Sequence, residues 1–70
     1  MSKESILAEI VRQQQIMAEL RESMCDIERR VPALLMEEEQ EKAQELYAQY
    51  FRRGCEYFKA YQIVCNLKLL

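Results

Sequence analysis

The sequence predicts an all-α fold in which two long helices form an antiparallel hairpin. Two observations predict it. Apolar residues recur at intervals of three and four along most of the 70 residues, and the chain contains one glycine and one proline. A hairpin of this size has little interior, so we expect two copies to assemble into a four-helix bundle as a dimer. The alternatives are a kinked long helix and a three-helix bundle with a break at Gly54.

The first helix is expected over about residues 3–30 of a single helical domain, 1–70. Ser2 is a favourable N-cap residue, and no glycine or proline interrupts the segment. A heptad repeat runs through it, and its members are Ile6, Ile10, Gln13, Met17, Leu20, Met24, Ile27 and Val31. The polar member, Gln13, either fixes the register of the packed helices or lies at a solvated end where Leu7 and Val11 are buried instead.

Pro32 predicts the turn, at about residues 31–33. Proline has no amide hydrogen and pushes the residue before it out of the helical region. Two arginines directly before this point suit the negative end of a helix. Because the four residues after Pro32 are good helix formers, a kinked continuous helix stays open as the alternative.

The second helix is expected over about residues 34–68. Its first turns are acidic and its later turns basic, which complements the helix dipole. The helical phase runs unbroken past Gly54 and favours a continuous helix, while a third helix after Gly54 is the alternative. With the turn near residue 32 this helix is longer than the first. We therefore expect its apolar end, residues 67–70, to extend past the first helix and to pack on another chain.

All six aromatic residues fall between positions 47 and 61, at spacings that place them on one helical face. Their rings offer more apolar area than one facing helix covers, so we expect the face to be shared between the core and a partner chain. The alternative is that the face is simply core. Gly54, in its middle, would let a partner helix approach closely. The candidate partner-binding residues are Tyr47, Tyr50, Phe51, Gly54, Tyr57, Phe58, Tyr61, Val64 and Leu67.

The composition argues against catalysis. The chain has no histidine, and its one glycine excludes a glycine-rich phosphate loop. The spacings of Cys25, Cys55 and Cys65 match no common zinc pattern. We expect no enzyme, no cofactor, no metal site and no small-molecule substrate. The favoured hypothesis is a non-catalytic helical protein–protein interaction module: an oligomerisation domain, an adaptor or a chaperone-like cap. Its partner would be a second copy in a homodimer or a larger helical protein.

The alternative hypothesis is a small dimeric helical-bundle regulator that binds nucleic acid. The candidate residues are Arg12, Arg29, Arg30, Arg52 and Arg53. A hairpin that turns near residue 32 would place Arg52 opposite Arg12 and form a short basic stripe. Against this hypothesis stand the net charge of −2 and the small number of basic residues.

The sequence also predicts an intracellular protein, cytoplasmic or nuclear. Glu4 and Glu9 interrupt the apolar run that a secretory signal needs, and the odd number of cysteines in helical sequence indicates reduced thiols. No segment approaches the roughly 18 apolar residues of a membrane span, so we expect no association with a membrane.

Overall fold

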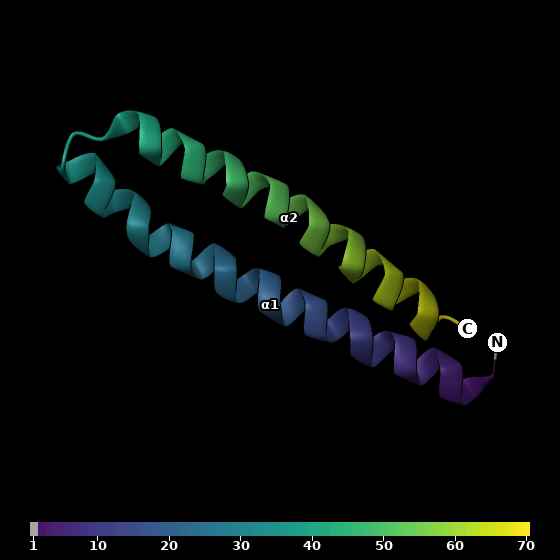
Figure 1. Cartoon of the computed structure of the whole chain (residues 1–70). Coiled ribbons are helices and arrows are strands. Elements are labelled where there is room, and N and C mark those ends of the chain that lie inside the picture. Colours follow the sequence, from purple (N-terminus) through teal and green to yellow (C-terminus); the bar gives the residue numbers. More distant parts are fainter. Residues whose placement is uncertain (1) are drawn as a thin grey trace.

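Two long helices lie side by side in an antiparallel hairpin in the computed structural model, which describes residues 2–70 (Figure 1). Helix α1 spans Lys3–Met36 and helix α2 spans Gln40–Lys68. The chain turns at one end, and both termini lie at the other (Figure 1). The molecule measures 54 × 14 × 12 Å. The predicted all-α hairpin is confirmed.

The helices meet along one line, which we term the seam. In both helices, each residue of a series with alternating steps of three and four is buried or half-buried. These are the a and d positions of a heptad repeat. In α1 the series is the predicted one, extended to Leu34. In α2 it consists of Ala43, Leu46, Tyr50, Arg53, Tyr57, Ala60, Val64 and Leu67, and Glu39, directly before the helix, continues it into the turn.

One well-covered part of the seam lies near the turn. Ile27, Val31 and Ala43 are buried there in one cluster, with Leu34 and Leu46 packed against it. A further buried set, Ala60 and Val64, lies toward the termini.

The turn is formed by Glu37–Glu39 instead of the predicted residues 31–33, because α1 continues through Pro32 for one more turn. Proline removes one backbone hydrogen bond, to the carbonyl group four residues earlier. That residue, Glu28, is exposed, so water can satisfy the carbonyl group. In return the helix carries Leu34 onto the buried cluster, where its side chain is packed. The packing of the half-buried Leu34 against the cluster offsets part of the cost of an interior proline.

A Schellman motif ends α1. The amide of Glu39 donates to the carbonyl oxygen of Leu34 at 2.9 Å, and the amide of Glu38 donates to that of Leu35 at 3.2 Å. Glu38 has a φ of 61°, in the left-handed region that usually holds glycine. Because glutamate occupies that position, the sequence carries no glycine signal where the chain turns.

Helix α2 begins at Gln40 instead of about residue 34, and it runs unbroken through Gly54. The predicted continuous helix is confirmed, and the break at Gly54 is wrong. The later turn also makes α1 the longer helix, so the expected overhang of α2 is wrong. At the terminal end the two helices meet around a shallow cavity lined by Lys3, Ile6, Leu7, Ile10, Leu67, Lys68 and Leu70.

Candidate interaction surface

The predicted aromatic face is divided into two lines in the structure. One line, Tyr50, Tyr57, Val64 and Leu67, belongs to the seam and is buried or half-buried against α1. The other line, Tyr47, Phe51, Phe58 and Tyr61, is exposed. The division follows from helix geometry, because the second line occupies the e and b positions of the heptad, beside the seam.

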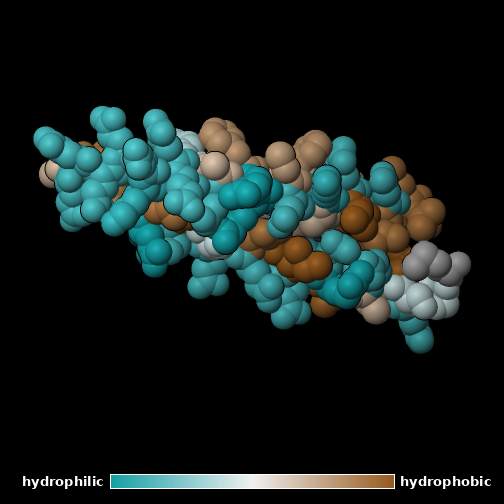
Figure 2. Space-filling view, turned by 45° about the horizontal axis from the view of Figure 1, so that its top comes forward, coloured by the Kyte–Doolittle hydropathy of each residue, from teal (hydrophilic) through white to brown (hydrophobic). Residues whose placement is uncertain are grey.

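Exposed apolar residues of both helices gather at these e and b positions. We term this surface the apolar side of the hairpin. In an antiparallel pair, the e positions of one helix lie opposite the e positions of the other helix. Both helices therefore contribute to the same side of the hairpin. Its exposed members are Leu7, Val11, Leu35, Tyr47, Phe51, Phe58 and Tyr61, and the half-buried Gly54 lies among them. Figure 2 shows one face of the molecule, on which hydrophobic residues gather toward the termini and hydrophilic residues cover the turn end.

A shallow groove surrounds Gly54 on this side. Its lining consists of Tyr50, Phe51, Gly54, Cys55, Phe58, Lys59 and Gln62. Gly54 does not have a positive φ, so the backbone does not require glycine there. A Cβ atom at this position would lie 3.6 Å from the terminal methyl group of Met24, an ordinary contact distance. The packing within the hairpin therefore does not require glycine either.

The aromatic rings near the turn are held by one another. The ring centroids of Tyr47 and Phe51 are 5.5 Å apart, and Tyr50 meets Phe51 edge-on at 6.0 Å. The hydroxyl group of Tyr50 donates a hydrogen bond of 2.7 Å to Glu28, which raises the pKa of the tyrosine. These contacts restrict the motion of the rings within the hairpin itself.

The opposite side of the hairpin, at the g and c positions, is mainly polar, and we term it the polar side. It carries the ion pairs between Glu9 and Arg12, at 2.7 Å, and between Asp26 and Arg30, at 3.1 Å. Residues of α1 are also less exposed on the polar side than on the apolar side. The g positions Glu9, Ile16 and Ser23 are half-buried, whereas the e positions of α1 are exposed.

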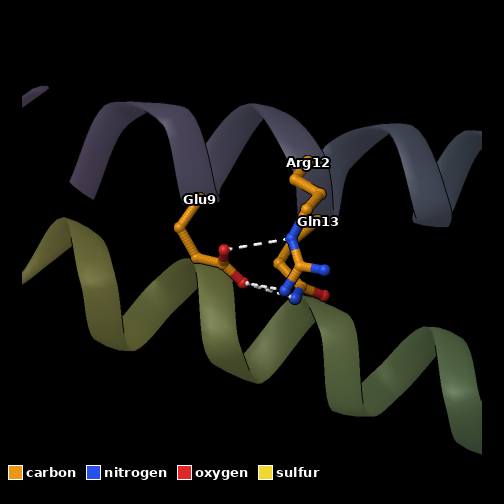
Figure 3. Close-up of polar contacts among 3 residues, drawn as sticks. All are labelled: Glu9, Arg12 and Gln13. Atoms are coloured by element: carbon orange, nitrogen blue, oxygen red, sulfur yellow. Dashed lines mark hydrogen bonds and ion pairs between the residues drawn. The ribbon is translucent and has the colours of Figure 1, made fainter. Parts of the chain in front are cut away.

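A polar network crosses from the polar side into the seam at Gln13 (Figure 3). The side-chain amide of Gln13 donates to Glu9 at 2.8 Å, and the guanidinium of Arg12 donates to both carboxylate oxygens of Glu9. The hydrogen bonds from Arg12 and then Gln13 lower the pKa of Glu9. Gln13 is 7% exposed, while Leu7 and Val11 are exposed. The interpretation of Gln13 as a solvated residue is therefore wrong.

The structure places Arg12 apart from the other candidate arginines. Met24 lies against Gly54, and Glu28 accepts a hydrogen bond from Tyr50. In both pairs the residue numbers add up to 78, so a residue of α1 and a residue of α2 with about this sum lie at the same level along the hairpin axis. Arg52 is then level with residue 26, roughly 21 Å along the axis from Arg12. The expected pairing of Arg12 with Arg52 is wrong because it assumed a turn near residue 32.

Four of the five candidate arginines have partners within their own helices. Arg12 pairs with Glu9, and Arg29 and Arg30 pair with Asp26. Arg53 occupies a d position of the seam and donates to Gln49.

The hairpin exposes more surface than a compact chain of its mass. Its accessible surface is 5683 Å², whereas a compact monomer of this mass exposes about 4,600 Å². Its radius of gyration is 16.1 Å, against about 11 Å for a compact domain of this length. The excess, about 1,000 Å², is comparable to the roughly 800 Å² that each partner buries in a standard protein interface.

Within residues 2–70, no group of three or more His, Cys, Asp or Glu side chains lies close enough together to hold a metal ion. Neither of the two helices has an apolar stretch of the length that a bilayer requires. Comparisons with family models, with curated proteins and with solved structures find no match to the chain.

Proposed function

We propose that this chain is a non-catalytic helical protein–protein interaction module that self-associates through its apolar side. The observation that carries the proposal is the line of exposed aromatic rings on α2, on a hairpin with about 1,000 Å² of surplus surface. A protein usually leaves such a surface exposed only where a partner covers it. A second hairpin packed on this side would give a four-helix bundle.

The area available supports a second copy as the partner. Aromatic side chains bury about 150–250 Å² each, so the exposed halves of Tyr47, Phe51, Phe58 and Tyr61 offer roughly 400 Å² per copy. The apolar residues of α1 on the same side and the backbone between them supply the rest of a standard interface. The nucleic-acid hypothesis has weaker support, because Arg12 lies apart from the other candidate arginines and three of the five are paired with carboxylates.

The test compares two replacements of an exposed apolar residue by glutamate. Phe58 lies on the apolar side, and Ile63 lies at a g position on the polar side. We expect the parent chain to be a dimer by sedimentation equilibrium. Phe58→Glu should weaken the association by about 100-fold or more, since a charge would be buried without a partner. Ile63→Glu should leave the association unchanged.

Both variants replace an exposed residue, so both should keep the helical circular dichroism of the parent. A parent chain that stays monomeric throughout the concentration series contradicts the proposal. Equal weakening by the two variants contradicts the assignment of the interface to the apolar side.

A further inference from the structure

We propose that two copies pair helix α2 against helix α2 in opposite directions, about a two-fold axis that passes Gly54. The turns of the two hairpins then lie at opposite ends of the bundle. This inference rests on the proposed self-association and adds its geometry: which helix meets which, in which direction, and at which residue.

The exposed line of α2 has the symmetry that such an axis requires. In a two-fold interface, residue i of one copy meets residue j of the other, and j meets i. Tyr47 and Tyr61 lie seven residues to either side of Gly54, while Phe51 lies three residues before it and Phe58 four after it. An antiparallel copy centred on Gly54 therefore places tyrosine level with tyrosine and phenylalanine beside phenylalanine.

The exposure of the four rings follows the same symmetry. Tyr47 and Tyr61 are each 49% exposed, and Phe51 and Phe58 are 63% and 57% exposed. Gly54 also lies at the midpoint of α2, Gln40–Lys68. An axis at this point gives the longest overlap of the two copies of the helix, and it places the glycine where the helices come closest.

The charges on α1 fit the same axis. In this arrangement α1 lies over the α1 of the second copy, and the axis passes near Met24, which is level with Gly54. Arg21 and Glu28 are exposed e positions on either side of that level. The two-fold axis brings Arg21 of each copy beside Glu28 of the other copy, which makes two contacts between opposite charges.

The other two-fold arrangement fits less well. If the turns lay at the same end, α2 of one copy would cover α1 of the other at the same level. Phe51 and Phe58 would then lie over Glu28 and Arg21, burying charges against rings and leaving each without an opposite charge.

The three native cysteines give a direct test. Cys55 is one residue from Gly54, and Cys25 is level with residue 53, so both lie near the proposed axis. Cys65 is eleven residues from Gly54, which puts its two copies roughly 33 Å apart along the bundle. We would prepare three variants, each keeping one cysteine with serine at the other two positions, and treat them with a short bis-maleimide.

We expect the variants that keep Cys25 or Cys55 to form covalent dimers, and the Cys65 variant to stay monomeric on a denaturing gel. The arrangement with turns at one end instead predicts that a mixture of the Cys25 and Cys55 variants forms covalent dimers, while neither variant links to itself. That result, or efficient linking through Cys65, overturns the inference and leaves self-association standing. A chain that is monomeric by sedimentation overturns both.

Charge exchange gives a second measurement that does not depend on cysteine reactivity. Arg21→Glu alone and Glu28→Arg alone should each self-associate about tenfold more weakly, because like charges then meet across the axis. A mixture of the two variants should recover the affinity of the parent, since every contact is again between opposite charges. A mixture as weak as its components overturns the proposed axis.

Discussion

The two sides of the hairpin differ in how their exposed residues are satisfied. On the polar side, charged residues find partners one turn away on the same helix, as Arg12 does with Glu9. On the apolar side, the rings of Phe51 and Phe58 are more than half exposed. A neighbouring residue one turn away can pair with a charge, but it does not remove the area of a ring from water. The comparison teaches that one side of this small domain pairs its exposed charges within the hairpin, whereas the other leaves apolar rings exposed.

Among substitutions that separate the fold from the association, Gly54→Ala has the largest expected effect. Within the hairpin the added methyl group fits beside Met24, at 3.6 Å, and alanine favours the helix by about 1 kcal/mol. Between hairpins the same methyl group stands at the proposed closest approach. We expect the variant to unfold at higher urea when dilute and monomeric, yet to associate about tenfold more weakly by sedimentation equilibrium.

Asn66→Ala is the matched control for that substitution. Asn66 is exposed at a c position on the polar side, where alanine also improves helix propensity. It should raise the stability of the hairpin and leave the association unchanged. If Gly54→Ala strengthens association as well as the fold, no helix approaches closely at Gly54.

The seam was predictable from sequence, whereas the turn was not. Heptad spacing identified the seam of α1 from Ile6 to Val31, because burial along one line needs that period in any sequence. The turn depends on a single left-handed residue, and here it is Glu38, which has no preference for that conformation. Pro32, the visible signal, is tolerated inside the helix because Leu34 beyond it is packed in the cluster.

That error in the turn propagated to the candidate sites. Which residues of α1 and α2 lie level depends on where the chain turns, so the paired arginines were placed incorrectly. The helical spacing of the aromatic residues depends on α2 alone and could be read from the sequence. Their division between seam and apolar side could not, because Tyr50 and Phe51 differ in burial only once α1 is in place.

Glu38→Gly is expected to have a smaller effect, confined to the fold. Glycine adopts a φ near 61° without the steric cost that a Cβ atom brings, which is about 1 kcal/mol. The free energy of unfolding of the monomer, measured with urea, should rise by about that amount. Because the turn lies outside both sides, the dimer dissociation constant should stay the same. A changed dissociation constant would indicate that the turn takes part in the interface.

The smallest expected effect is that of Glu9→Gln on the polar side, and it depends on pH. Hydrogen bonds from Arg12 and Gln13 lower the pKa of Glu9 below its ordinary value of 4.5. The unfolded chain therefore takes up the proton first as the pH falls. The contribution of this carboxylate to stability is complete above the unfolded pKa and is lost as the pH falls through the folded pKa.

Urea unfolding from about pH 6 to about pH 3 measures that contribution. The parent should be more stable than Glu9→Gln at the upper end, and the gap should close at the lower end, where both side chains are neutral. Association at neutral pH should be the same for both chains, since the network of Glu9 is complete within one hairpin. If Glu9→Gln weakens association, the polar side also meets the second copy, and the contrast between the two sides does not hold.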